Sequence, residues 1–137
     1  MTSFLNLRWT LLLIVAAASQ AVAQSPSYEV ISRCFFIYAA AHEAARDMVQ
    51  PLLFQYTQPR VGWMAGFMTG HQSNEAFASI FDANITSNKQ FAMKIDRQIR
   101  AAIKTQNSAA FDAVIDETLS CDAALGIKAE WRPRLAP

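Results

Sequence analysis

The sequence predicts an all-α protein, a bundle of four or five helices closed by one disulfide after a cleaved signal peptide. Three observations predict it. Apolar residues recur every three to four positions through most of the chain, which is the period of a helix with one buried face. No segment of comparable length alternates apolar and polar residues as a half-buried strand does. The chain also has two cysteines, Cys34 and Cys121, which suit a single crosslink.

Residues 1–23 have the layout of a secretory signal peptide. Arg8 precedes an apolar run over 11–18, and the small residues Ala21-Val22-Ala23 precede Gln24. Because this run is too short to cross a bilayer comfortably, we expect cleavage rather than a membrane anchor. The mature chain is therefore expected to begin near Gln24.

The remaining residues, 24–137, have a length that suits one compact domain. They contain eleven basic and eleven acidic residues, so their formal charge is zero. A neutral exported chain argues against binding to nucleic acid, which normally brings a basic excess. We expect a soluble periplasmic domain without stable membrane insertion, ending in an irregular tail over 127–137.

Helices are expected one after another through this domain. Residues 28–50 contain no glycine or proline and predict one long helix that ends at Pro51. After it we expect a short helical turn over 52–57, which Pro59 interrupts, a helix over 61–70 and a short helix over 73–84. A further helix is expected to begin at a capping box formed by Ser87 and Gln90. The last helix is expected between a break at 106–108 and Gly126.

A stripe of glycines marks the helix expected over 61–70. Gly62, Gly66 and Gly70 lie four residues apart, so they share one helical face that allows close approach of a second helix. The alanine-rich first helix is the expected partner, although the pattern leaves open packing against a second copy in a homo-oligomer. Since glycine destabilises a helix, we expect close packing to compensate and Gly66 to be sensitive to substitution.

The two cysteines are expected to form a structural disulfide. Cys34 lies inside the first expected helix and Cys121 near the end of the last, and an oxidising compartment favours joining them. The alternative, a redox pair, normally has the spacing CxxC, which is absent. In the chain-entropy model a loop of this length stabilises the fold by about 4 to 5 kcal/mol.

One segment offers a candidate copper site. Met64, Met68 and His71 follow at i, i+4 and i+7, and two thioethers with an imidazole suit Cu(I), while the Trp63 ring could shield the ion. The same residue types at helical spacing are also ordinary core residues. A periplasmic copper or small-ligand carrier is therefore the alternative function.

No enzymatic motif appears in the chain. His42 and Glu43 begin the pattern of a zinc-protease helix, but Arg46 stands where the second histidine is needed. The chain also lacks the GxSxG pattern of serine hydrolases. We therefore expect a protein that is not an enzyme.

Two groups of residues are candidates for an interface. A basic stripe on the helix that follows Ser87 can face solvent, pair with the acidic last helix or meet a partner. In the tail, a tryptophan lies beside two arginines, a combination common among interface anchors. The candidate residues are Arg97, Arg100 and Lys104, which continue from Lys94, and Trp131, Arg132 and Arg134.

The run Ile31-Ser32-Arg33-Cys34, followed by Tyr38 and by a cysteine in a late helix, resembles small helical immunity proteins that protect bacteria from type VI secretion amidases. Those proteins are exported, disulfide-containing and all-helical. The resemblance implies a non-enzymatic protein that binds another periplasmic protein, as an inhibitor. The toxin-binding loop of that family has no counterpart here, so the resemblance assigns no inhibitory residue.

Overall fold

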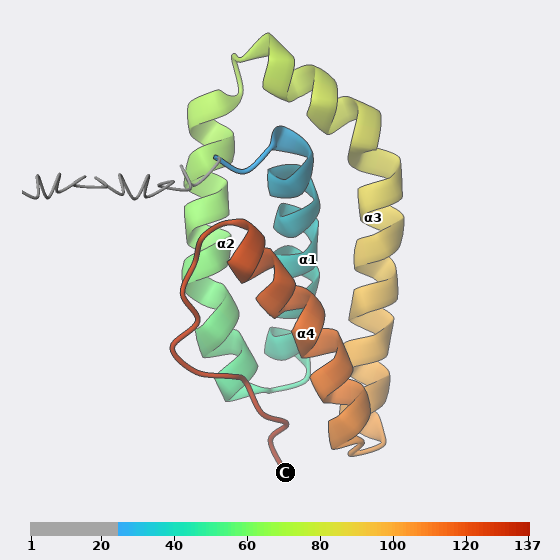
Figure 1. The fold of residues 1–137 in the computed structure, drawn as a ribbon. Helices are drawn as coiled ribbons and strands as arrows, with labels where there is room; N and C mark the ends of the chain where they lie inside the picture. Colours follow the sequence, from blue (N-terminus) through green and yellow to red (C-terminus); the bar gives the residue numbers. More distant parts are fainter. Residues whose placement is uncertain (1–24) are drawn as a thin grey trace, which may run out of the picture.

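The computed structural model describes residues 25–137, so the predicted signal peptide lies outside the described residues. The described part forms helices and loops without any strand, which confirms the all-α prediction. The helices are α1 (Tyr28–Asp47), α2 (Pro51–His71), α3 (Glu75–Lys104) and α4 (Ser108–Ala124), and the chain ends in an irregular tail (Figure 1).

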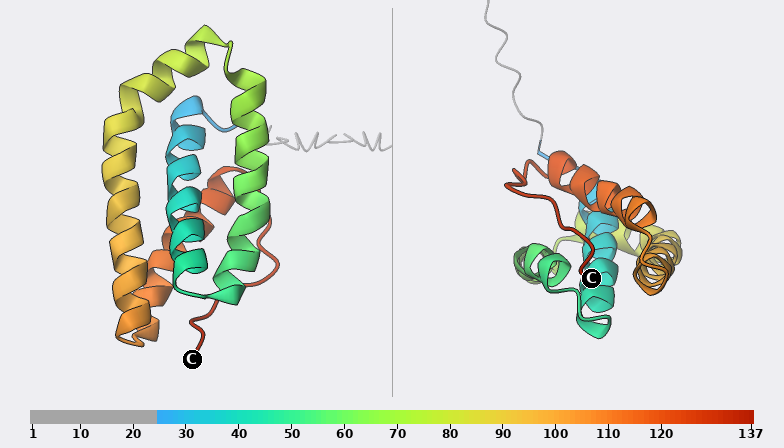
Figure 2. Two further views of the ribbon diagram at one scale, coloured as in Figure 1. Left: turned by 180° about the vertical axis from the view of Figure 1, so that it is seen from behind. Right: turned by 90° about the horizontal axis from the view of Figure 1, so that it is seen from below.

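The first three helices form one layer, with α1 between α2 and α3 (Figure 1). Helix α4 crosses α1 obliquely on one side of this layer, and the tail runs from α4 across to α2. Seen from behind, α1 faces the viewer, and none of the other three described helices lies over it (Figure 2). One face of the layer is therefore covered by α4 and the tail, and no other element of residues 25–137 covers the opposite face.

Side-chain caps set where three of the helices begin. Ser27 accepts a hydrogen bond from the Val30 backbone N–H at 3.3 Å, and Asn74 and Asn107 cap α3 and α4 in the same way. Such caps satisfy backbone N–H groups that have no partner inside a helix. Helix α2 has no side-chain cap and begins at Pro51, whose missing N–H would have had no helical partner.

The predicted interruption at Pro59 is wrong, because α2 continues through it from Pro51 to His71. A proline inside a helix leaves one carbonyl without its N–H partner, here that of Gln55. Both Pro59 and Gln55 are exposed. Water can therefore bond this carbonyl, and the packing of the rest of α2 outweighs the local cost.

The predicted break over 84–87 is also wrong, since α3 is one helix that bends after its first turns (Figure 1). The Asn84 side chain donates to the Ile80 carbonyl at 2.8 Å, and the Ser87 hydroxyl donates to the Asn84 carbonyl at 3.0 Å. Side chains that bond backward in this way are typical of bent helices. Ser87 therefore bonds within a continuing helix instead of capping a new one.

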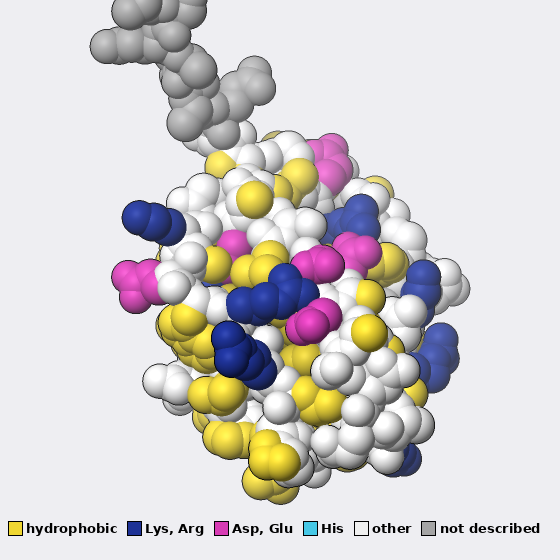
Figure 3. Space-filling view, turned by 60° about the horizontal axis from the view of Figure 1, so that its bottom comes forward, with side chains coloured by type: hydrophobic (Ala, Val, Ile, Leu, Met, Phe, Trp, Pro, Cys, Tyr) yellow, Lys and Arg dark blue, Asp and Glu magenta, His cyan; other side chains and the backbone are white. Residues whose placement is uncertain are grey.

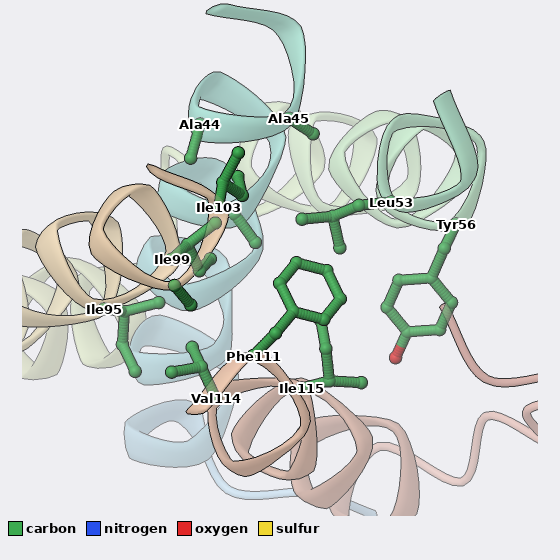
Figure 4. Close-up of a cluster of buried hydrophobic side chains, with 12 residues drawn as sticks. Ala44, Ala45, Leu53, Tyr56, Ile95, Ile99, Ile103, Phe111, Val114 and Ile115 are labelled. Atoms are coloured by element: carbon green, nitrogen blue, oxygen red, sulfur yellow. The ribbon is translucent and has the colours of Figure 1, made fainter. Parts of the chain in front are cut away.

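The core consists of two clusters. In the cluster that is lower in the view of Figure 1, Ala41, Ala44 and Ala45 of α1 let larger side chains of the other three helices approach closely (Figure 4). The larger side chains include Leu53, Tyr56, Ile95, Ile99, Ile103, Phe111, Val114 and Ile115. The upper cluster packs Ile31, Ile37, Tyr38, Met64 and Phe77 around the two cysteines.

The glycine stripe is exposed, so the prediction of close packing against α1 is wrong. A Cβ atom built at Gly62, Gly66 or Gly70 would meet no atom of the described residues within 4 Å. The buried side of α2 is set by its large residues, among them Leu53 and Met64, and this orientation turns the glycines toward solvent. Packing of the stripe against a second copy stays a prediction.

The predicted disulfide is confirmed. Cys34 and Cys121 are bonded, with their Cα atoms 5.6 Å apart, and both residues are buried. The bond joins α1 to α4 across a sequence separation of 87 residues. No helix within residues 25–137 is long and apolar enough to cross a membrane.

Candidate functional site

A buried carboxylate organises the region where α1, α2 and α4 meet. Asp122 of α4 is 2% exposed and accepts four hydrogen bonds. The Tyr38 hydroxyl donates to Oδ1 at 2.6 Å and the Tyr56 hydroxyl to Oδ2 at 2.7 Å. Arg60 donates to both oxygens, from Nε and Nη2, at 2.6 Å each. This bidentate geometry adds both energy and geometric specificity to the ion pair.

The position of Arg60 is fixed from three sides. Besides its bonds to Asp122, Nη1 donates to the Tyr56 carbonyl at 2.6 Å. The guanidinium carbon lies 3.6 Å from the centre of the Tyr56 ring, a cation–π contact.

Burial is the main cause that raises the pKa of both Tyr38 and Tyr56, and the bonds to Asp122 add to it. The tyrosines therefore remain neutral donors over the physiological pH range.

A pocket of about 460 Å³ opens directly above this network, between α2 and the tail. Two tryptophans line it, Trp63 of α2, which is 47% exposed, and Trp131 of the tail, which is 39% exposed. The Trp131 ring meets the Tyr56 ring edge to face at 6.0 Å. The other lining residues are Gln55, Pro59, Arg60, Ile127, Lys128 and Glu130.

The sequence places these residues together in two ways. Tyr56, Arg60 and Trp63 lie four and seven residues apart, so they share one side of α2. On the other wall, Gly126 has a φ of 70°, which favours glycine, and there the chain leaves α4 and turns toward α2. The tail then runs back along α2, which brings Trp131 beside Tyr56.

Contacts beyond the pocket hold the tail in place. Arg132 Nη1 donates to Asp116 at 2.6 Å, and its Nε contacts Asp112. Pro133 is buried, and the Ala136 N–H donates to the Gln50 side chain at 2.8 Å. The pocket is thus a preformed part of the fold, with one wall supplied by the irregular tail.

The structure separates the predicted interface residues. Trp131 lines the pocket, Arg132 is engaged by α4, and Arg134 is exposed outside the pocket. The predicted basic stripe lies on α3, which α1 separates from α2 (Figure 1). Figure 3 shows basic side chains along its right edge, the side on which α3 lies. The stripe residues Arg97, Arg100 and Lys104 therefore do not share a surface with the pocket.

The basic stripe does not pair with the acidic last helix. Arg100 bonds to Asp96 of its own helix and to Asp47 of α1. Among the described residues no ion pair joins α3 to α4. The acidic α4 is instead paired with Arg60 of α2 and Arg132 of the tail.

The four predicted copper-site residues do not share one environment, although Met68 packs against the same core cluster as Met64. Met64 is fully buried in the upper core cluster, whereas Trp63 lines the pocket. The His71 ring stacks on Phe67 at 3.9 Å, and its Nδ1 lies 2.9 Å from the Phe67 carbonyl. Within residues 25–137 no group of three or more His, Cys, Asp or Glu is arranged to hold a metal ion. Copper binding stays a prediction, and the structure does not bring Trp63 and Met64 to one site.

Sequence reasoning missed Tyr56, Arg60 and Asp122 as members of a site. A signal for Asp122 was present, because it lies four residues after Thr118 and seven after Ile115, on the buried side of α4. A carboxylate at such a position requires a hydrogen-bonded or cationic partner. The sequence did not identify Arg60 as that partner, because the two residues are 62 positions apart.

No protein-family model matches the chain, and comparisons with curated proteins and with solved structures find no match either.

Proposed function

We propose that this chain is an exported helical protein that acts by binding another protein, and that the pocket between α2 and the tail is its contact site. One observation carries the proposal: Trp63 and Trp131 stay exposed on the two walls of a preformed pocket. Exposed tryptophans cost solvation free energy in a monomer, and tryptophan, tyrosine and arginine are the residues that most often dominate binding energy at interfaces.

The rigidity of the pocket supports binding. Arg60 at its base cannot adopt other conformations without breaking its bonds to Asp122 and Tyr56. A preformed surface loses less conformational entropy when a partner binds, so more of the contact energy appears as affinity. The Cys34–Cys121 bond holds α4, and with it the start of the tail, against α1.

The signal-like pattern of residues 1–23 and the buried disulfide favour export to the periplasm. An immunity role against a secreted amidase is one form of this proposal, and the resemblance in residues 31–38 supports it. In the structure, Cys34 and Tyr38 of that segment form the disulfide and the Asp122 network. They would thus shape the fold of an inhibitor without touching the target.

Site-specific crosslinking tests the proposal in the compartment where it applies. A photoreactive residue in place of Gln55, which is exposed at the pocket, is expected to trap one protein in periplasm. The same crosslink should disappear in the Trp63→Ala and Trp131→Ala backgrounds. It should persist in Met93→Ala, which removes an exposed apolar side chain from α3. Absence of a crosslink, or a crosslink that both tryptophan variants keep, would refute the proposal.

A further inference from the structure

We infer that the pocket between α2 and the tail binds a proline-rich segment of a partner protein in the polyproline II conformation. The inference rests on the proposed function and names the chemistry of the partner. Three features of the pocket carry it: the rings that line it, its balance of hydrogen-bond donors and acceptors, and its charge.

The pocket walls are built from flat rings. Trp63 and Trp131 supply indoles from opposite walls, Tyr56 lies at the base, and Pro59 adds a further ring. Proline-rich segments dock into grooves lined by aromatic residues because their rings pack flat against aromatic faces. The volume of about 460 Å³ lies within the range of roughly 300 to 1,000 Å³ that is usual for ligand sites.

The hydrogen-bonding groups of the pocket are mostly donors. Each tryptophan has an indole N–H that can only donate, and the Lys128 ammonium also only donates. Within residues 25–137 none of these three groups takes part in a side-chain hydrogen bond with a described residue. Proline residues present carbonyl acceptors and no N–H donors, so such a segment satisfies donors without adding buried donors of its own.

The charge of the pocket is balanced. Arg60 is neutralised by Asp122, and Lys128 is offset by Glu130 on the same wall. A site for a phosphate or another strong anion would present a net positive charge. An uncharged segment fits this balance better than an anion does. The polyproline II conformation also exists before binding, which reduces the entropy lost on docking.

Intrinsic fluorescence reports directly on this pocket. The whole chain contains three tryptophans, and Trp9 is removed with the predicted signal peptide. The remaining two, Trp63 and Trp131, both line the pocket. Protein purified from the periplasm is titrated with end-blocked octaproline, and a glycine-serine peptide of equal length serves as the matched control.

Octaproline is expected to change the tryptophan emission in a saturable way, and the glycine-serine peptide is not. Trp63→Ala and Trp131→Ala, each of which keeps one reporter, should weaken binding by about tenfold or more. Met93→Ala should leave the affinity unchanged. Thermal unfolding checks each variant, and Trp63→Ala is expected to stay folded because its side chain is half exposed on α2.

Three results would overturn the inference: no response to octaproline, an equal response to the glycine-serine peptide, or a response to inorganic phosphate that octaproline does not compete away. The crosslinking experiment separates this outcome from failure of the proposed function. If the tryptophan-dependent crosslink forms and octaproline does not bind, the partner uses another chemistry and only the present inference fails. If neither experiment gives a signal, both proposals fail.

Discussion

Replacing Arg60 by methionine tests whether the buried network holds α2 to α4. The substitution keeps a long flexible side chain and removes the charge. Asp122, which is 2% exposed beside Arg60, would then keep the hydroxyls of Tyr38 and Tyr56 as its remaining side-chain partners. Removal of one member of a buried ion pair costs about 3 to 5 kcal/mol, because the other charge stays buried without compensation.

The expected cost lies at the lower end of that range, about 3 kcal/mol. Two tyrosine hydroxyls still bond the carboxylate, and the pocket beside Arg60 gives water a route toward it. Asp122→Asn is expected to cost less, about 1 to 3 kcal/mol, because the amide oxygen can still accept and Arg60 can turn toward the pocket. In the double variant the loss should fall short of the two single losses added together, by about 1 kcal/mol or more.

Denaturant unfolding at neutral pH with the disulfide intact gives each free energy of unfolding. Arg97→Met is the matched control, since Arg97 is exposed and forms no ion pair with any described residue. Its effect should stay within about 0.5 kcal/mol. A loss below about 1 kcal/mol for Arg60→Met, or additive losses in the double variant, would show that the network does not hold the fold as argued.

Three further outcomes follow from the same structure. Gly66→Ala should raise the free energy of unfolding by about 0.5 to 1 kcal/mol, because no described residue crowds the new methyl group. A loss of stability on denaturant titration would instead indicate a packed face. Joint replacement of Cys34 and Cys121 by alanine should lower the free energy of unfolding by up to about 4 to 5 kcal/mol, seen as a large drop in Tm. An unchanged Tm would contradict a stabilising crosslink. Burial raises the pKa of Tyr38 and Tyr56, so the unfolded chain loses these protons at a lower pH than the folded protein does. The free energy of unfolding should therefore fall as the pH rises above about 10. Unfolding curves that do not change through that range would argue against burial of both hydroxyls.

The helical fold was predictable because its signals are local. Three- and four-residue apolar spacing predicted buried helix faces, and the segment over 28–50 corresponds closely to α1. Local signals failed where a helix continues through residues that usually interrupt or begin one. Pro59 lies inside α2, and the Asn84 and Ser87 pattern lies inside a bent α3, because packing along each helix outweighs one lost or diverted hydrogen bond.

The orientation of α2 was not predictable from its own sequence. The glycine spacing and the positions of the large residues suggest different buried faces, and a helix with apolar residues on several sides gives no decisive preference. Contact with α1 decides the matter, because Leu53 and Met64 bury far more apolar surface than three glycines can. The same orientation of α2 about its axis turns Trp63 toward the pocket and Met64 into the core.

By itself, the sequence determined the class of the fold, the pairing of the two cysteines and the expectation of export, because these depend on periodicity, on cysteine number and on a short N-terminal pattern. Only the tertiary structure decided which residues meet. Arg60 and Asp122 are 62 positions apart, and Trp63 and Trp131 lie on different elements. The ion pair of the first two and the shared pocket of the second two therefore depend on how α4 and the tail cross α2. Side-chain partners at that separation are set by packing, and packing is a property of the whole chain.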